Sequence, residues 1–164
     1  MVTLSAKRLY FFRHGLADRS AWSGSDFERP LTAAGKQRLT QEALTLARLN
    51  LGVDLILTSP LVRAQQTAAI VASALNLTHC LEVEERLAFG WAGQELVQIL
   101  LDYPATERPL LVGHEPDFSL TISEITGGSE VICKKGSLAR IDLTAGLPLS
   151  GELVWLIPPK VLAL

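Results

Sequence analysis

Two kinds of hydrophobic pattern alternate along the chain. Short β-prone runs occur at residues 8–12, 53–57 and 109–112, and the second of them is almost wholly apolar. A short apolar run of this kind is typical of a strand that is buried on both faces in a parallel sheet. Between these runs, apolar residues recur every three or four positions, as they do on one face of a helix. The alternation predicts an α/β architecture.

Four segments carry the helical pattern. In the first, Leu39, Ala43 and Leu46 fall on one face, Thr32 can cap the beginning, and Gly52 is suited to close the end. The four expected helices are residues 33–50, 61–75, 93–103 and 117–125.

Three further strands are expected at residues 81–83, 138–143 and 152–157. A turn region rich in Gly and Pro separates the last two, and we expect one of these terminal strands to be antiparallel to the others. Residues 16–30 are rich in Ser, Asp and Gly and have no apolar period. A loop of that length inside a compact domain is usually functional.

These elements predict a three-layer α/β sandwich in which helices flank a mainly parallel central sheet. Right-handed crossovers place the carboxyl ends of parallel strands at one rim of the sheet, where ligands bind. The sequence contains no repeats, low-complexity tracts or linkers, so we expect one domain over residues 1–164.

Composition excludes several classes of protein. The 164 residues are 48% hydrophobic, enough for a sizeable core, and 15 Lys+Arg against 17 Asp+Glu give a net charge of −2. That balance argues against a general binder of nucleic acid or of an anionic membrane. No apolar run is long enough for a membrane span or a secretory leader, so we expect a cytoplasmic protein. Cys80 and Cys133 are far apart and fit free thiols better than a metal site.

Basic residues follow three predicted strands. Arg13 and His14 come after the first, Arg63 lies just after the second, and His114 follows the strand at 109–112. The side chains should therefore meet at one rim and form a cationic pocket that suits a phosphoryl group. Arginine offers a planar fork of donors to phosphate oxygens. Histidine can be an uncharged nucleophile or a protonated donor, so His14 would attack phosphorus while charged His114 holds an oxygen.

Each residue has a plainer interpretation when taken alone. Arg13-His14 could form a surface turn, Arg63 could be solvated in the first turn of a helix, and His114 could cap one. Because these residues all follow the ends of predicted strands, a shared binding site is favoured over three unrelated roles. Nucleotide-binding and zinc-protease patterns do not occur.

The motifs around these residues resemble those of the histidine phosphatase superfamily, also called phosphoglycerate mutase-like. Residues 11–15 (FFRHG) are similar to its first histidine motif, 59–67 (SPLVRAQQT) to its SxxxRAxxT segment, and 112–116 (VGHEP) to its second histidine motif. The short chain and residues 25–35 (SDFERPLTAAG) most resemble the compact SixA-type phosphohistidine phosphatases.

This resemblance implies a phosphoglycerate mutase-like fold and an enzyme that needs neither metal nor cofactor. It also implies that His14 becomes transiently phosphorylated, while Arg13, Arg63 and His114 bind the phosphoryl oxygens. The positive charges of the two arginines should lower the pKa of His14 and keep its attacking nitrogen unprotonated.

The chain departs from the family at the general acid. Many members place a carboxylic acid a few residues before a glycine, and here the spacing from Glu84-Glu85 to Gly90 does not match. Glu85 is a candidate acid, and a solvated pair at a strand end is the alternative. A phosphorylated imidazole leaves more easily than an alkoxide once its ring is protonated. The missing acid therefore favours phosphohistidine over a phosphate ester as substrate.

Several further residues could support the predicted site without taking part in the chemistry. Asp26 and Arg29 could order the long loop by pairing with each other or with the rim, or they could belong to an exposed polar loop. Ser59 and Thr67 could orient Arg63, or they could cap and pack the helix. The pair Lys134-Lys135 is better explained as a solvated turn than as a docking patch for an acidic partner.

Three functions remain open from the sequence. The first is a metal-independent phosphatase that removes the phosphoryl group from a phosphohistidine on a protein. The second is a phosphomonoesterase on a small sugar or nucleotide phosphate, with Glu85 as acid. The third is a regulatory module that binds phosphoryl groups without turnover, although an intact His14 argues against it. The expected partner is accordingly a phosphorylated protein or a small phosphorylated substrate.

Overall fold

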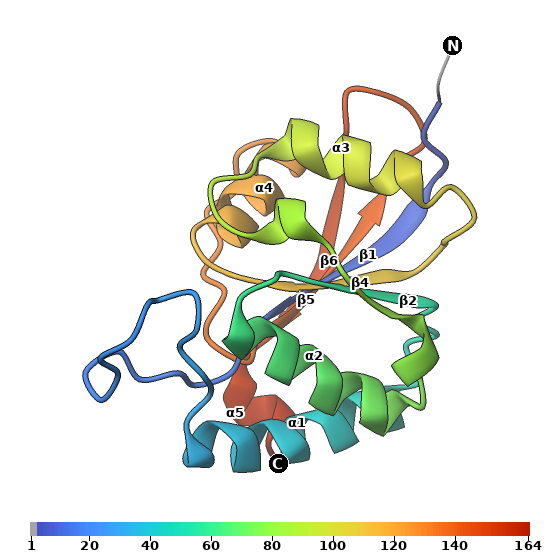
Figure 1. The fold of residues 1–164 in the computed structure, drawn as a ribbon. Helices are drawn as coiled ribbons and strands as arrows, with labels where there is room; N and C mark the ends of the chain where they lie inside the picture. Colours follow the sequence, from blue (N-terminus) through green and yellow to red (C-terminus); the bar gives the residue numbers. More distant parts are fainter. Residues whose placement is uncertain (1–2) are drawn as a thin grey trace.

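A six-stranded sheet with the order β3-β2-β4-β1-β5-β6 forms the centre of the computed structural model, which describes residues 3–164 (Figure 1). Its strands are β1 (Lys7–Arg13), β2 (Leu55–Thr58), β3 (Leu81–Val83), β4 (Pro109–Gly113), β5 (Leu138–Leu143) and β6 (Gly151–Ile157). The first four are parallel, β5 is antiparallel to β1, and β6 is antiparallel to β5. Of the two terminal strands, β5 therefore runs against the others, as the sequence predicts.

Helices cover both faces of this sheet. The regular ones are α1 (Ala33–Leu49), α2 (Val62–Leu75), α3 (Gly93–Asp102), α4 (Asp117–Ile125) and α5 (Pro159–Leu162), with 3₁₀ turns η1 (Thr78–Cys80) and η2 (Glu85–Leu87). In Figure 1, α1, α2 and α5 lie below the sheet, and α3 and α4 lie above it. The three-layer prediction is confirmed. The short α5 and both 3₁₀ turns were not predicted, because four residues or fewer carry no helical period.

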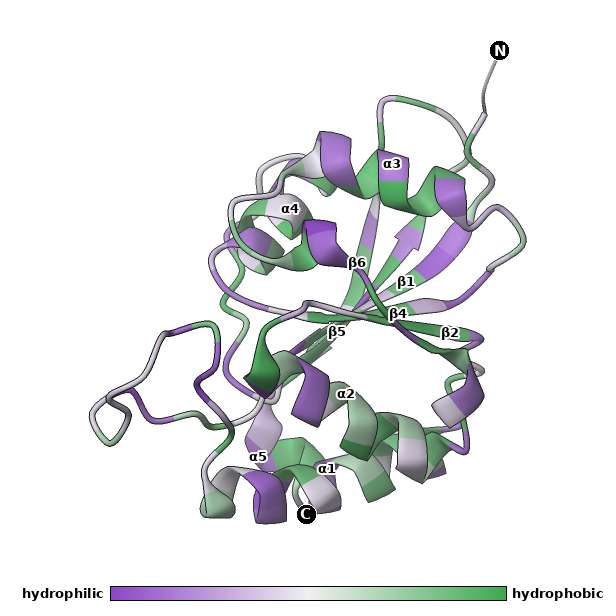
Figure 2. Cartoon of the chain, in the orientation of Figure 1, coloured by the Kyte–Doolittle hydropathy of each residue, from purple (hydrophilic) through white to green (hydrophobic). Residues whose placement is uncertain are grey.

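Successive residues of β1 point to opposite faces and join two separate cores. Leu9 and Phe11 pack in the layer of α3 and α4, whereas Tyr10 and Phe12 pack in the layer of α1 and α2. Every residue of β2 and β4 is buried, and both strands are green in the hydropathy view of Figure 2. Their apolar composition thus reflects burial on both faces.

The ends of α1 show one confirmed and one wrong prediction. At the beginning, the Thr32 hydroxyl accepts a hydrogen bond from the Gly35 amide at 2.9 Å, as expected of a cap. At the end, the capping residue is Asn50, with a left-handed φ of 47°, rather than Gly52, which has a φ of 67° two residues later. Asparagine tolerates that conformation because its short polar side chain can bond locally.

The parallel register brings three distant segments to one rim. Arg13 is opposite Gly113, and Thr58 is opposite Val112. Beyond the strands, the His14 amide donates to the Gly113 carbonyl at 3.0 Å. The residues that follow β1, β2 and β4 are therefore neighbours. Within residues 3–164, none of the helices has both the length and the apolar character that a membrane span requires.

Candidate active site

His14 lies directly after β1 with 4% of its surface exposed. Its Nδ1 donates a hydrogen bond to the Gly15 carbonyl at 2.7 Å, so Nε2 is the unprotonated nitrogen that carries the lone pair. Nε2 in turn accepts from Nε of Arg63 at 3.3 Å. Burial, followed by the proximity of His114 and of Arg63, lowers the pKa of His14 to about 2. At neutral pH this imidazole is uncharged, with Nε2 available for attack.

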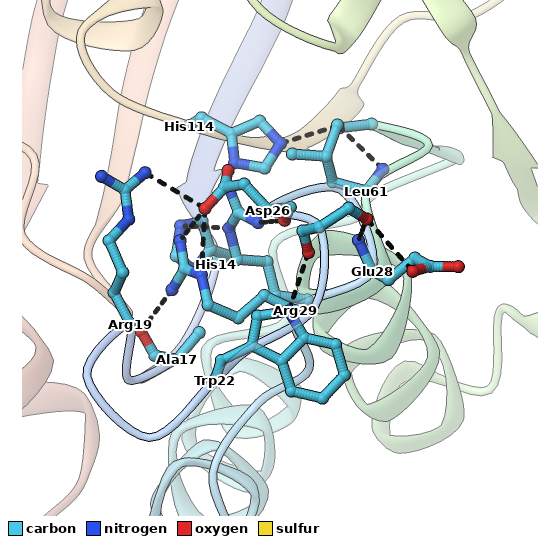
Figure 3. A network of polar contacts seen from close by, with 12 residues as sticks. His14, Ala17, Arg19, Trp22, Asp26, Glu28, Arg29, Leu61 and His114 are labelled. Carbon is cyan, nitrogen blue, oxygen red and sulfur yellow. Dashed lines mark hydrogen bonds and ion pairs between the residues drawn. The ribbon is translucent and has the colours of Figure 1, made fainter.

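Arg63, in the first turn of α2, is held from two sides. Besides its bond to His14, one terminal nitrogen donates to the Asp26 carbonyl at 2.6 Å and the other to the Asp26 carboxylate at 3.0 Å. The same carboxylate accepts from Arg19 and Arg29, as Figure 3 shows. Asp26 and Arg29 therefore order the long loop 16–30 by pairing with each other and with the rim.

Asp26 is ionised in this setting. Burial opposes its negative charge, but hydrogen bonds from Arg19 and Arg29 and the charge of Arg63 outweigh that effect and lower the pKa to about 2. A carboxylate with such a pKa cannot serve as an acid at neutral pH. Its role is to fix the orientation of the arginine beside the nucleophile.

His114 follows β4 and faces His14 across a centroid separation of 5.2 Å (Figure 3). Its Nε2 lies 2.7 Å from the Ser59 hydroxyl, which also accepts from the Leu61 amide at 3.3 Å. That hydroxyl can donate its own proton to Nε2, and His114 then carries its hydrogen on Nδ1. Nδ1 is buried and has no partner within residues 3–164. In this tautomer Nδ1 is a donor for a group that enters the site.

The pKa of His114 is also low. Burial, followed by the charges of Arg63 and Arg13, lowers it to about 3 in the ligand-free protein. The expected charged form would therefore have to be induced by a bound dianion, and it stays a prediction. Neutral His114 can still donate through Nδ1.

Arg13 supplies a second unsatisfied donor. One of its terminal nitrogens donates to the Cys133 carbonyl at 2.8 Å, while its Nε is buried and unpartnered among the described residues. Buried donors without partners are rare and costly in folded proteins. Two of them beside an uncharged histidine form an arrangement that an oxyanion would satisfy.

All four predicted residues line one cavity of about 460 Å³. Its charged lining consists of four arginines and Lys135 against Asp18, Asp26 and Glu115, a local charge of +2 in a chain whose net charge is −2. A groove of about 520 Å³ beside α3 and α4 is larger but contains none of the predicted residues. Because the local charge of the smaller cavity is opposite in sign to the net charge of the chain, this cavity is the one that attracts an anion.

The structure does not bring Glu85 into this cavity. Glu85 lies on η2 with an exposed side chain and is not part of the lining, while the neighbouring Glu84 pairs with Arg86 at 2.6 Å. Phe89 occupies the wall instead. Its ring lies 4.8 Å from that of His114.

Two supporting residues differ from expectation in detail. Thr67 donates to the Arg63 carbonyl at 2.7 Å and accepts from the Gly15 amide at 3.1 Å, so it joins the arginine segment to the nucleophile segment. Ser59 bonds to His114 rather than to Arg63. The sequence does not predict the contact between Ser59 and His114, because β2 and β4 become neighbours only in the folded sheet.

Neither cysteine forms a disulfide in the described part of the chain. Burial and the nearby Glu115 raise the pKa of the Cys133 thiol to about 12, so it is unreactive. Across residues 3–164, no cluster of three or more His, Cys, Asp or Glu side chains is arranged to hold a metal ion.

Comparison with known families agrees with this geometry. The sequence model of the histidine phosphatase superfamily (branch 1) matches residues 9–114, a segment that contains the first histidine motif and ends at His114 of the second. The chain belongs to the histidine phosphatase superfamily. An uncharacterised protein from Picosynechococcus sp. is 42% identical over 110 residues, which are 66% of this chain and 67% of that protein.

Solved structures of this superfamily share the fold. The protein histidine phosphatase SixA complexed with tungstate has a TM-score of 0.79 at 25% identity, over 94% of this chain and 99% of that one. The α-ribazole phosphatase from Shigella flexneri has a TM-score of 0.64 at 20% identity, over 88% and 96% of the two chains. The predicted phosphoglycerate mutase-like fold and the SixA-like assignment are confirmed, while the neighbours differ in substrate.

In this member of the histidine phosphatase superfamily, the low pKa values of His14 and His114 predict a loss of stability on acidification. Both imidazoles of the unfolded chain take up protons below about pH 6.5, whereas the folded protein holds their pKa values near 2 and 3. The unfolded state binds more protons than the folded state below pH 6.5. The free energy of unfolding therefore decreases as the pH is lowered below this value. Glu42 opposes this trend, because burial raises its pKa to about 7.

A variant isolates the contribution of the nucleophile. In His14→Asn, we expect the pH slope of the unfolding free energy between pH 6.5 and 4.5 to decrease by up to about 1.4 kcal/mol per pH unit. Urea denaturation at several pH values measures this slope. His79 is exposed on η1, outside the cavity, and His79→Asn is the matched control for the loss of one imidazole. An unchanged slope in His14→Asn would show that His14 is not held neutral.

Proposed function

We propose that this protein is a phosphohistidine phosphatase that works through a phosphorylated His14. The observation that carries the proposal is one cavity in which the free Nε2 of His14 meets Arg63 and the unpartnered donors of Arg13 and His114. These groups match the needs of phosphoryl transfer, where catalysis consists mainly of positioning and of stabilising charge on the equatorial oxygens.

The proposed reaction has two steps. In the first, Nε2 of His14 attacks phosphorus, a new N–P bond forms, and the N–P bond of the substrate breaks. The substrate imidazole leaves with the bonding electron pair as a neutral ring, because its other nitrogen has taken a proton from solvent. In the second, water attacks the phosphorus of phospho-His14, which releases inorganic phosphate and restores the free imidazole.

Arg13, Arg63 and His114 would bind the transferring group in both steps. Arg63 is already oriented by Asp26, so little side-chain freedom is lost when the phosphoryl group enters. The proposed reaction needs no metal ion, because arginines supply the positive charge that phosphoryl transfer requires.

The carboxylates of the cavity favour phosphohistidine over an ester. Hydrogen bonds from Ser20 lower the pKa of Asp18, and Asp26 has a pKa of about 2. Glu115 accepts hydrogen bonds from the Ser119 hydroxyl and the Cys133 amide. An alkyl ester needs a proton donor for its leaving alkoxide, whereas phosphohistidine does not. The SixA neighbour is named as a protein histidine phosphatase, which supports the same choice, and a phosphorylated protein in the cytoplasm is the proposed partner.

Parallel assays test the substrate class. We expect kcat/KM for a phosphohistidine-containing protein to exceed that for an alkyl phosphate ester by at least about 100-fold, the usual contribution of a general acid. Release of inorganic phosphate measures both reactions. Comparable rates on the two substrates would contradict the proposal.

The rival function is a small-molecule phosphomonoesterase. It would be supported by efficient ester hydrolysis that is lost in Glu85→Gln, with phosphohistidine turnover unaffected. Loss of ester hydrolysis in Glu115→Gln would support an ester function with a different acid, since Glu115 lines the cavity.

A further inference from the structure

The cavity wall at Lys135 belongs to residues 131–137, a segment that is attached to the nucleophile segment. The Gly136 amide donates to the carbonyls of Arg13 and His14 at 3.0 and 3.2 Å, and the Ser137 carbonyl accepts from the Arg13 amide at 3.2 Å. The position of this wall relative to His14 is therefore set by backbone hydrogen bonds.

Gly136 is the residue that allows this approach. Its φ of +81° lies in the left-handed region, and a Cβ at this position would be 2.6 Å from a carboxylate oxygen of Glu42. A side chain would be strained and would clash, so the glycine keeps the backbone close to β1. The preceding residue, Lys135, is thereby directed to the cavity.

The two adjacent lysines of this wall have different environments. Lys134 is exposed and does not line the cavity, whereas Lys135 is half-buried and does. This corrects the expectation that the pair is merely a solvated turn. The difference between the two lysines was not visible in the sequence, where they are adjacent residues of the same type.

Lys135 is also the cavity cation whose charge is least compensated. Arg19, Arg29 and Arg63 share the carboxylate of Asp26, and Arg13 donates to the Cys133 carbonyl. Across residues 3–164, no carboxylate lies within ion-pair distance of the Lys135 ammonium group, and that group makes no hydrogen bond. All three of its donors remain available.

The surroundings of Lys135 are electropositive. Burial, followed by the charges of Arg13, Arg29 and Arg63, lowers its pKa, while Asp18 across the cavity opposes that effect. Like charges that face one cavity repel in the empty protein. A bound anion would remove the repulsion, and a phosphoryl dianion would balance the local charge of +2.

We propose that Lys135 is a further phosphoryl-binding residue, whose ammonium group donates hydrogen bonds to a tetrahedral oxyanion held by Arg13, Arg63 and His114. The inference rests on the location of the phosphoryl site in the proposed function, and it requires neither turnover nor a particular substrate. A cation that contacts phosphoryl oxygens without contacting the attacking or the leaving nitrogen binds the ground state and the transition state alike. Its removal should therefore raise KM more than it lowers kcat.

Lys135→Met and Lys134→Met form a matched pair for the test, with inorganic phosphate as the probe. In isothermal titration calorimetry at low ionic strength, we expect Lys135→Met to weaken phosphate binding about tenfold, as the loss of a charged hydrogen bond predicts. Lys134→Met should stay within about twofold of the wild type, and Lys135→Arg should retain most of the affinity. Wild-type affinity in Lys135→Met would overturn the inference, as would a wild-type protein that binds no phosphate.

Thermal unfolding gives a second readout that separates binding from folding. Without phosphate, Lys135→Met should melt at or above the temperature of the wild type, since a repelled charge has been removed. With phosphate, its rise in Tm should be smaller than that of the wild type. An equal rise in the two proteins would overturn the inference. If phosphohistidine is not hydrolysed while Lys135→Met still loses phosphate affinity, the proposed function fails and this inference stands.

Discussion

Replacing His14 by asparagine is expected to reduce turnover of a phosphorylated substrate by about four orders of magnitude or more, the usual effect of removing a nucleophile. The amide of asparagine can still bond to the Gly15 carbonyl, but it offers no lone pair in place of the Nε2 that Arg63 contacts. Steady-state release of inorganic phosphate measures the effect.

Phosphate binding provides the control for this variant. Arg13, Arg63 and His114 keep their own contacts to Cys133, Asp26 and Ser59, so the variant should still bind inorganic phosphate. Loss of turnover with retained binding would assign His14 to chemistry. Residual turnover above about one hundredth of the wild-type rate would contradict the role of His14 as nucleophile.

Arg63→Lys is expected to lower kcat/KM by about three orders of magnitude, although the charge is conserved. An arginine that stabilises a transferring phosphoryl group commonly contributes an effect of this size. Arg63 uses Nε toward His14 and both terminal nitrogens toward Asp26, and a lysine has no planar fork to repeat that pattern. Steady-state kinetics on a phosphohistidine substrate measures the loss.

The matched control is Arg48→Lys, an exposed position in the last turn of α1 that is outside the cavity. This variant should have wild-type kinetics. If Arg63→Lys retained more than about a tenth of wild-type kcat/KM, charge alone would suffice, and the bidentate geometry would have no catalytic role.

Much of the framework can be predicted from the sequence because burial and chain direction are local signals. The apolar runs at β1, β2 and β4 mark strands covered on both faces, and parallel strands must end at the same rim. Arg13, His14 and His114 are placed together by this rule alone. The helix at 61–75 then brings Arg63 to the same rim, since it begins immediately after β2.

The rest of the site depends on contacts that no local pattern records. Lys135 reaches the cavity because Gly136 bonds to the end of β1, more than 100 positions earlier in the chain. Phe89 lines the wall because the adjacent Gly90 amide donates to the buried carboxylate of Asp117 at 3.1 Å. The same backbone path leaves Glu85 on the outside of η2. The course of these loops follows from tertiary packing rather than from residue periodicity.

The phosphorylated intermediate is the centre of this account, and it can be trapped. Wild-type protein should be mixed with a phosphohistidine substrate, quenched within the first turnovers, and digested for mass spectrometry at neutral or alkaline pH. We predict one acid-labile phosphoryl group per chain on Nε2 of His14, since Nδ1 is occupied by the Gly15 carbonyl. Turnover that proceeds with no phosphorylated His14, or with the phosphoryl group on another residue, would contradict the mechanism.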